Sequence, residues 1–373
     1  MREFIDGAEA IARGALDAGC TFFAGYPITP ATPILLHMVE ELPKVGGVAI
    51  QAEDEIAALG FCIGATLAGM RALTATSGPG ISLYSEHIGL AIMGEVPLVI
   101  VDVQRMGPAT GGATTTAQGD IQFLRWGTSG GFPVIVLAPA DVRTCYSLTQ
   151  RAFDLAERFR VPVMLATDME TVNTRTTVDT STFERIPVRE RAQAPAETAF
   201  VPYRAPQPDG VPPMTPLGGP HIVRFTGSSH DERGYLSKAP GEVGDLNARL
   251  AAKIEKHVDE MALVDADLQA GAEALLVSYG ISAQAARQAA AQARAAGRRV
   301  SVLTVYSLWP VPEAAIRAAM AGVERVIVAE LNLGQYRREI ERLARDDQAV
   351  IGAHRVDGEL IASAEILTAG GLI

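Results

Sequence analysis

Three polar residues lie where the pattern of the chain predicts the end of a β-strand. Thr29 belongs to the run Tyr-Pro-Ile-Thr-Pro at 26–30, and Glu55 closes the acidic run Gln-Ala-Glu-Asp-Glu at 51–55. Arg105 follows the apolar segment 98–103. In open α/β sheets this edge is where ligands bind. A carboxylate such as Glu55 can hold a protonated ring nitrogen, and a guanidinium such as Arg105 can clamp a substrate carboxylate through two hydrogen bonds.

Each of these residues also has a purely structural interpretation. Thr29, which stands before a proline, is typical of an N-cap and first-turn pair. Glu55 could be a first-turn carboxylate favoured by the helix dipole, although Glu53 and Asp54 crowd it with like charge. Arg105 could form an ion pair with a nearby acid. From the residues alone, these alternatives stay open.

Common catalytic and nucleotide-binding motifs are absent from the sequence. The turn Ser-Gly-Pro-Gly at 77–80 begins like a dinucleotide-binding pattern but has Leu83 at the third glycine position. We interpret it as a tight turn whose glycines let a ligand or neighbour approach. There is no phosphate-binding P-loop and no G-x-S-x-G, which argues against an α/β hydrolase. Cys20, Cys62 and Cys145 are far apart, so thiolates alone cannot hold zinc or an iron–sulfur cluster, and no metal site is expected.

The elements that position these residues follow a strand–helix alternation. Strands are predicted at 21–24, 48–50, 72–76, 98–103, 133–137 and 161–165, with helices between them. This alternation indicates an α/β fold with a doubly wound parallel sheet. From about 171 to 263 the periodicity fades and prolines cluster, which indicates an extended crossover. Alternation resumes with predicted strands at 274–279, 300–305 and 325–330, as a second, smaller α/β domain. We divide the chain into 1–185, 186–265 and 266–373.

Composition and charge narrow the function classes. Of 373 residues, 48% are hydrophobic and 20% are charged, as in a soluble protein with a well-filled core. The net charge of −11, without long Lys or Arg runs, argues against a nucleic-acid-binding face. No apolar stretch reaches membrane-spanning length, and the N-terminus lacks the apolar centre of a signal peptide. A cytoplasmic protein is expected.

The combination of motifs resembles the α subunit of 2-oxoacid:ferredoxin oxidoreductases of the 2-oxoglutarate, branched-chain and pyruvate types. The resemblance rests on the Tyr-Pro-Ile-Thr-Pro element, the Glu55 segment, Gly-Glu-Val-Pro at 94–97, and Gln-Arg-Met-Gly-Pro-Ala-Thr-Gly at 104–111. It implies that 1–185 is a pyrimidine-binding domain of the thiamine-diphosphate fold and that 266–373 is a transketolase C-terminal-like domain. The segment with His230, Asp231 and Glu232 also resembles one in these subunits, but no chemistry is assigned to it.

The resemblance assigns roles residue by residue. Glu55 matches the glutamate that contacts N1′ of the thiamine aminopyrimidine and so favours the imino tautomer that strips the thiazolium proton. Thr29 and Arg105 match residues near the substrate carboxylate, the match at Arg105 being looser by one position. Tyr26 and Pro27 would shape the wall of the site. The cofactor-binding set is therefore Tyr26, Pro27, Ile28 and Glu55.

The resemblance also implies partners. The diphosphate and metal motif, Gly-Asp-Gly followed by Asn, is missing here. In the family, thiamine diphosphate is shared with a β subunit, and Mg²⁺ and [4Fe-4S] clusters lie on partner subunits. A γ subunit, a candidate δ subunit, ferredoxin, a 2-oxoacid and coenzyme A complete the expected partners, in a dimer of heteromers. The small residues of the 57–68 helix, Gly60 and Gly64 among them, would pack across a subunit boundary.

Three functions follow from this resemblance. The first is oxidative decarboxylation of a 2-oxoacid (2-oxoglutarate, branched-chain or aromatic) to an acyl-CoA with reduction of ferredoxin. The second is a ferredoxin-independent 2-oxoacid dehydrogenase component. The third is a non-catalytic scaffold subunit of the same assembly. The sequence leaves the 2-oxoacid, the stoichiometry and the physiological electron acceptor undetermined.

Overall fold

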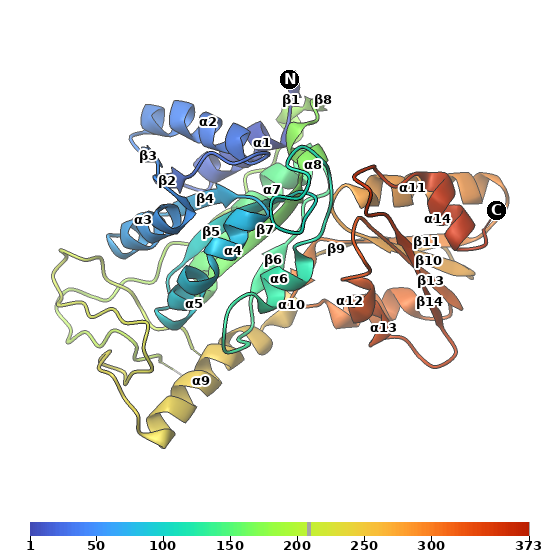
Figure 1. Ribbon diagram of the computed structural model, residues 1–373. Coiled ribbons are helices and arrows are strands. Elements are labelled where there is room, and N and C mark those ends of the chain that lie inside the picture. The colour runs from blue at the N-terminus through green and yellow to red at the C-terminus, as the bar shows by residue number, and fades with distance from the viewer. Residues whose placement is uncertain (207–209, 373) are drawn as a thin grey trace.

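The predicted strands of the first half form one sheet in the computed structural model, which describes residues 1–206 and 210–372 (Figure 1). Seven strands build this sheet: β2 (Phe22–Gly25), β3 (Val48–Gln51), β4 (Ala72–Thr76), β5 (Leu98–Gln104), β6 (Ile135–Leu137), β7 (Pro162–Asp168) and β12 (Ser307–Trp309). Their order is β12-β6-β7-β5-β4-β2-β3. All neighbours are parallel except β12, which pairs antiparallel with β6. Apart from this sheet, β1 (Arg2–Ile5) and β8 (Thr176–Asp179) form a two-stranded antiparallel ribbon.

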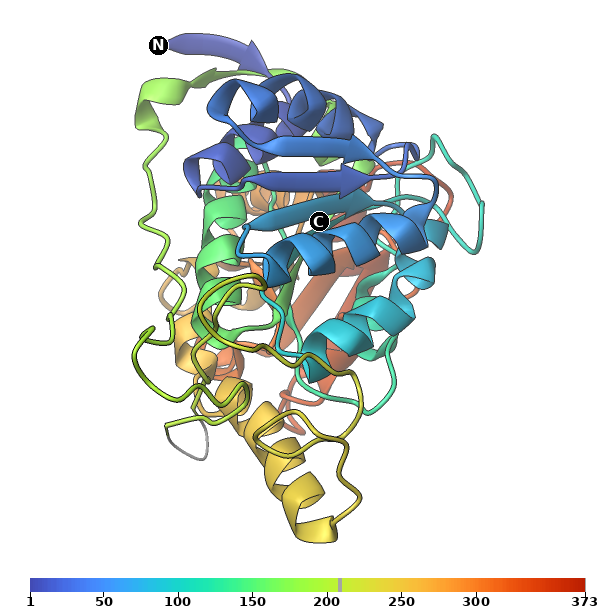
Figure 2. The same cartoon turned by 90° about the vertical axis from the view of Figure 1, so that its left-hand side faces the viewer.

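Both faces of the sheet are covered, as its apolar strands require. The covering helices are α1 (Gly7–Asp17), α2 (Thr32–Glu41) and α7 (Val142–Phe159) on one face, and α3 (Glu55–Leu67), α4 (Pro79–Leu83), α5 (Ser85–Met93) and α6 (Ile121–Trp126) on the other. Along β5, Ile100 packs toward α3 and α5 whereas Val99 and Val101 pack toward α1 and α7, which is the two-residue period of a strand. Figure 2 looks toward the β3 edge between these two layers. Short elements complete this part: η1 (Leu42–Val45), α8 (Met169–Asn173) and η2 (Thr180–Thr182).

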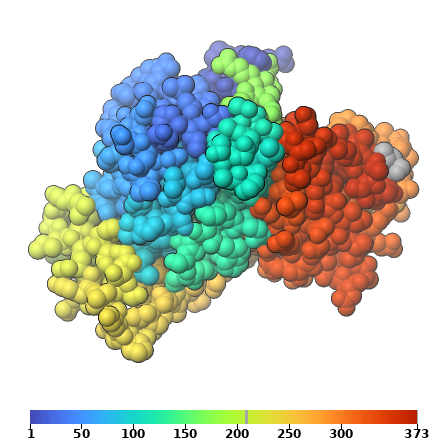
Figure 3. Space-filling model, viewed as in Figure 1, coloured from blue at the N-terminus to red at the C-terminus, as the bar shows by residue number. Residues whose placement is uncertain are grey.

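An extended crossover leads away from the first domain and ends in α9 (Pro240–Glu255) and α10 (Val258–Met261). In Figure 3 its yellow part forms a separate bulge below the blue domain. A buried ion cluster fixes α9 to that domain. Glu95 accepts hydrogen bonds from Arg249 at 2.6 and 2.9 Å and from Lys253 at 2.9 Å, while Arg160 donates to the Glu95 backbone carbonyl at 3.0 Å. Desolvation by itself would raise the pKa of Glu95, but the charges of Lys253 and Arg249 outweigh it and lower that pKa.

The second domain is a smaller five-stranded α/β sheet. Its strands are β9 (Val264–Asp267), β10 (Ala274–Ser278), β11 (Val300–Val305), β13 (Arg325–Glu330) and β14 (Ala349–His354), in the order β14-β13-β10-β11-β9 with β9 antiparallel. Helices α11 (Ser282–Ala295) and α14 (Ser363–Ala369) cover one face, and α12 (Glu313–Met320) and α13 (Arg337–Glu341) the other. None of the described helices is long and apolar enough to cross a membrane.

The two domains share a core and a polar joint centred on Gln118. One apolar cluster continues from the α3–α5 face of the first sheet into the α12–α13 face of the second. The side chain of Gln118, which is completely buried, donates to the Tyr279 carbonyl at 3.2 Å and accepts from Ser282 Oγ at 2.9 Å and the Leu331 amide at 3.1 Å. Asn332 donates to the Gln118 carbonyl at 2.7 Å. The second domain therefore holds the end of the loop that begins at Arg105.

Candidate active site

Four loops leave the carboxyl edge of neighbouring parallel strands and carry the predicted residues. Thr29 follows β2, Glu55 follows β3, the turn with Gly78 and Gly80 follows β4, and Arg105 follows β5. These strands are adjacent in the order β5-β4-β2-β3. The topology thus brings to one edge residues that are up to 76 positions apart, such as Thr29 and Arg105.

Glu55 is the first residue of α3, and its neighbour Asp54 caps that helix by accepting from the Ala57 amide at 2.7 Å. Because Asp54 is the cap, the Glu55 carboxylate is not needed for that purpose. Glu55 is only 7% exposed, yet within the described residues it makes no hydrogen bond or ion pair. A buried carboxylate without a partner is costly, so a donor from outside the described chain would stabilise it.

The glycine turn after β4 lies directly against Glu55. A Cβ at Gly80 would stand 2.9 Å from Oε1 of Glu55 and 2.1 Å from Oγ1 of Thr76. Gly78 adopts φ +44, which favours glycine. The predicted tight turn with a close approach is confirmed. The hydroxyls of Thr76 and Ser77 are buried and have no hydrogen-bond partner in the described residues, and that of Thr76 lies on the same Gly80 position as the carboxylate.

Arg105 reaches the other end of the same turn. It is 5% exposed, its Nη1 donates to the Thr29 backbone carbonyl, and a Cβ at Gly78 would stand 3.5 Å from its Nε. Nε is buried without a hydrogen-bond partner, and no carboxylate of the described residues forms an ion pair with this guanidinium. The structural alternative for Arg105, an ion pair with a nearby acid, is therefore not seen as a direct contact in that part of the chain, although the charge of Arg105 acts on the carboxyl group of Asp120.

The structure also decides the alternative for Thr29. Helix α2 begins at Thr32 with Ala31 as its N-cap, and no side chain caps it. The prediction that Thr29 and Pro30 open this helix is wrong, because the helix begins two residues after Pro30 and Ala31 takes the N-cap position. Thr29 is exposed instead, at the rim of the edge that Arg105 occupies.

The remaining predicted residues come from the same loop. Tyr26 is 38% exposed, and Pro27 is half-buried. Ile28 is half-buried and packs against the core under α1 and α2, so it fixes the loop. Their assignment to the cofactor wall stays a prediction.

Two acids under this edge were missed by the sequence reasoning. Asp102 lies within β5 and is completely buried, and the carboxyl group of Asp120 faces it. Burial raises the pKa of Asp120 to about 6, although the Arg105 charge opposes the rise. Burial and the Asp120 charge raise the pKa of Asp102 well above its usual range. The sequence signal that could have revealed Asp102 is its place as an acid inside the otherwise apolar strand at 98–103.

Comparison with known proteins identifies the family. The family described as "Pyruvate flavodoxin/ferredoxin oxidoreductase, thiamine diP-bdg" matches residues 13–245, and "Pyruvate:ferredoxin oxidoreductase core domain II" matches 272–366. The 2-oxoglutarate synthase subunit KorA of Methanothermobacter thermautotrophicus is 43% identical over 98% of this chain and 96% of its own length. The chain belongs to the 2-oxoacid:ferredoxin oxidoreductase family.

Two further relatives support the placement in this family. The ketoisovalerate oxidoreductase subunit VorB of the same organism is 34% identical over 98% of this chain and 96% of its own. The solved 2-oxoglutarate:ferredoxin oxidoreductase from Magnetococcus marinus superimposes with a TM-score of 0.93 at 30% identity and covers 98% of this chain. Our chain spans 64% of that solved chain's length. The predicted family, α/β fold class and oxidoreductase assignment are confirmed.

The segment that was left without chemistry lines a cavity in the crossover region. His230 is 1% exposed and contributes to a cavity of about 780 Å³ with Tyr203, Asp231 and Arg249. Its Nδ1 lies 2.8 Å from the Ser228 carbonyl, and its ring centroid lies 4.0 Å from that of Tyr203 with the two rings tilted by 45°. None of the residues that line this cavity belongs to the loops that carry Glu55, Thr29 or Arg105.

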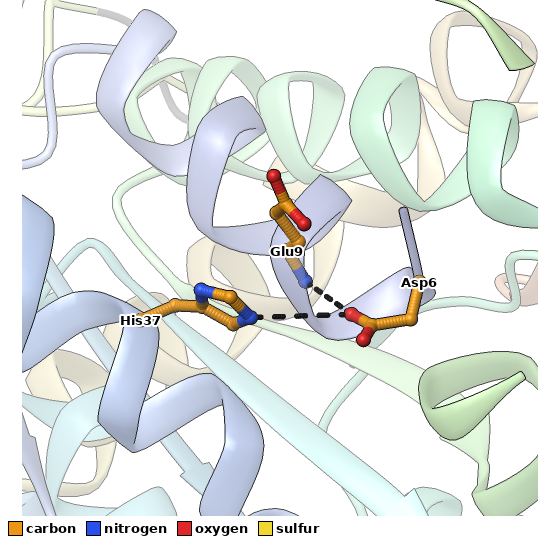
Figure 4. A group of neighbouring side chains, drawn as sticks. All are labelled: Asp6, Glu9 and His37. Carbon is orange, nitrogen blue, oxygen red and sulfur yellow. Dashed lines mark hydrogen bonds and ion pairs between the residues drawn. The ribbon is translucent and has the colours of Figure 1, made fainter. Parts of the chain in front are cut away.

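One group of side chains in the described chain has metal-like spacing, namely Asp6, Glu9 and His37 (Figure 4). Each of its carboxylates already has a structural role. Asp6 caps α1 by accepting from the Glu9 amide at 2.9 Å, and it faces His37 at 4.0 Å. The Glu9 carboxylate accepts from Arg13 at 2.5 Å. These contacts account for the group without a cation.

Proposed function

We propose that this chain supplies the pyrimidine-binding half of a thiamine-diphosphate site that oxidatively decarboxylates a 2-oxoacid. One observation carries the proposal. The carboxylate of Glu55 and the guanidinium of Arg105 are buried at the two ends of the Gly78–Gly80 turn, and within the described residues neither forms an ion pair. Buried charges of opposite sign that lack an ion pair, separated by a turn too tight for side chains, suit two different groups, one on the cofactor and one on the substrate.

The residues at this edge fit the aminopyrimidine end of thiamine diphosphate. Glu55 would accept a hydrogen bond from the ring, and the Thr76 hydroxyl, which has no partner in the described residues, lies close to Gly80. When bound, the cofactor supplies the nucleophilic carbon and the electron sink for decarboxylation. Glu55 holds the ring in the tautomer that can move a proton, and Gly80 leaves the space that this contact needs.

Arg105 and Thr29 would hold the carboxylate of the substrate. The guanidinium is fixed through its bond to the Thr29 carbonyl, so its Nε remains free to donate to an oxygen anion. We propose 2-oxoglutarate as the first substrate to test, because the more similar relatives bear the name 2-oxoglutarate synthase. A branched-chain 2-oxoacid is the second, since relatives named ketoisovalerate oxidoreductase follow at lower identity.

A partner subunit would complete the site. The face beside Glu55 exposes apolar side chains, with Ile56 and Phe61 each 47% exposed on α3. Gly64 lies on the same helix, with no atom within 4 Å of a Cβ built on it. We propose that a β subunit carrying the diphosphate, Mg²⁺ and cluster sites covers this face. Two electrons would then leave through the clusters to ferredoxin, while coenzyme A takes the acyl group.

The test uses the assembled complex purified with its natural partners. Ferredoxin reduction is measured with coenzyme A and, in turn, 2-oxoglutarate, 3-methyl-2-oxobutanoate and phenylpyruvate. In Glu55→Gln the amide cannot carry the charge that stabilises the active tautomer, and we expect turnover to fall by at least about 100-fold. Glu53→Gln, an exposed position two residues earlier, is the matched control and should keep turnover within about twofold.

The other two functions give different outcomes. Unchanged turnover in Glu55→Gln would favour a scaffold subunit. Turnover that reduces a nicotinamide but not ferredoxin would favour a ferredoxin-independent dehydrogenase component.

A further inference from the structure

A pair of acids, Asp102 completely buried and Asp120 half-buried, lies beneath the substrate side of the site. Asp102 stands in the middle of β5, where its Cα pairs with Thr76 of β4 and Ala166 of β7. The groups that face its carboxyl are the Gly78 backbone amide and the Asp120 carboxyl. Neither oxygen of Asp102 receives a well-aligned hydrogen bond from a donor in the described residues, and Oδ2 of Asp120 is likewise buried without one.

Two carboxyl groups in such contact cannot both be ionised in a dry environment. A single proton between them turns two competing acceptors into a donor and an acceptor, which satisfies both. The pair then carries one negative charge. The backbone fixes the position of Asp120. Its amide donates to Gln104 Oε1 at 3.1 Å, and Gln104 Nε2 in turn donates to the Thr167 carbonyl at 3.2 Å.

That negative charge faces Arg105. The guanidinium is the one cation whose charge acts on Asp120, and within the described residues it has no salt bridge of its own. In the free site, therefore, the charge of the acid pair balances that of Arg105 without occupying its hydrogen-bond donors. The ionisable groups that act on the pair are the two acids themselves and Arg105. The neighbouring side chains Thr76, Ser77 and Thr167 are uncharged hydroxyls.

We infer that binding of the 2-oxoacid carboxylate at Arg105 is coupled to uptake of one proton by the Asp102–Asp120 pair. This inference rests on the proposed function of Arg105. An arriving carboxylate takes over the neutralisation of Arg105, so the charge on Asp120 loses its partner and gains a second anion nearby. A proton from solvent then binds to Asp120, and both acids are neutral in the complex. No bond other than this O–H bond forms or breaks, and nothing is oxidised.

Linkage gives the sign of the pH effect. A ligand that raises the pKa of a group binds more tightly when that group is protonated. The dissociation constant for the 2-oxoacid should rise with pH by up to about tenfold per unit above the pKa of free Asp120. Below that value, where the pair already holds both protons, the constant should be flat.

The experiment is calorimetry of oxamate, an unreactive analogue of the 2-oxoacid head group, binding to the assembled complex. Titrations at pH 7 in phosphate and in Tris, whose ionisation enthalpies differ, count the protons taken up. We expect between about half and one proton per site in the wild type and about none in Asp120→Asn. Glu86→Gln, an exposed acid on α5, should retain the wild-type number.

A second variant keeps the inference testable if Asp120→Asn does not fold. In Asp102→Asn the amide N–H is a weaker donor than the acid O–H that lowers the pKa of Asp120, so this pKa rises and more of Asp120 already holds its proton at pH 7. Proton uptake at pH 7 should fall while oxamate still binds. Oxamate binding with no proton uptake in the wild type, or with uptake unchanged in both variants, would overturn the coupling but not the site. Failure of oxamate and of every 2-oxoacid to bind would overturn the proposed function and the coupling together.

Discussion

The carboxylate of Glu55 lies directly on the backbone of Gly80, so that a Cβ at position 80 would stand 2.9 Å from Oε1 of Glu55. Contacts this short are almost never seen for a real Cβ, and the other side of the same position is closed by Thr76 Oγ1. The turn therefore limits the positions that the Glu55 carboxylate can occupy. This relationship gives the first prediction.

Gly80→Ala should displace Glu55 or Thr76 and weaken cofactor binding. A shift of a few tenths of an ångström to 1 Å in a catalytic group costs on the order of 100-fold in rate. We expect turnover of the complex to fall by about 10- to 100-fold, with recovery of part of the loss at high thiamine diphosphate concentration. The measurement is turnover against cofactor concentration. Unchanged turnover and cofactor affinity would show that the contact has no functional role.

Gly64 provides a contrasting glycine on α3, because no atom lies within 4 Å of a Cβ there. Gly64→Ala should stabilise the helix by roughly 1 kcal/mol, since glycine in a helix interior is unfavourable relative to alanine. If the exposed face of α3 packs against a partner, the bulkier Gly64→Leu should prevent assembly while the chain remains folded. Size-exclusion chromatography with thermal unfolding checks both points. If Gly64→Leu assembles normally, the partner subunit does not pack against this face of α3.

Gln118→Ala should loosen the joint between the domains. It removes the acceptor of the Leu331 amide and of Ser282 and the donor to Tyr279, and it leaves buried polar groups without partners. We expect a loss of about 2–4 kcal/mol in unfolding free energy and a raised KM for the 2-oxoacid, because the loop from Arg105 ends here.

Denaturant unfolding and steady-state kinetics measure these two effects. Gln122→Ala is the matched control. It also crosses the joint, donating to the Gln335 carbonyl at 2.9 Å, but it is only half-buried. Its cost should be smaller, and equal losses in the two variants would argue against a special role for Gln118.

Glu95→Gln should be among the more destabilising single changes in the crossover. Removing the anion leaves Arg249 and Lys253 buried without their partner, which typically costs about 3–5 kcal/mol. The lowered pKa of Glu95 gives the sign of the pH effect: its contribution is present above the unfolded pKa and is lost as pH falls through the folded one. The stability difference between wild type and variant should therefore shrink at low pH. Denaturant unfolding at pH 7 and at about pH 3 tests this, and a difference independent of pH would contradict it.

Much of the architecture could be read from local pattern. The apolar segments at 72–76, 98–103, 274–279, 300–305 and 325–330 became β4, β5, β10, β11 and β13, because strands buried on both faces need continuous apolar character. The glycine turn at 77–80 was also predictable, since few residues other than glycine tolerate such a conformation. The start of α2 was not, because its first turn has no side-chain cap and depends on how the preceding loop packs.

The sequence by itself determined the strand–helix order, the carboxyl-edge position of Thr29, Glu55 and Arg105, and the motifs that resemble the family. Only the tertiary structure decided which of those side chains have partners. Asp54 caps α3 and α2 begins only after Ala31, so neither Glu55 nor Thr29 is needed as a cap, and the return of the loop after β5 to Gln104 brought Asp120 to Asp102 and Arg105. The physical reason is range: propensity and periodicity act over a few residues, whereas desolvation and charge pairing depend on whatever the fold places within a few ångströms.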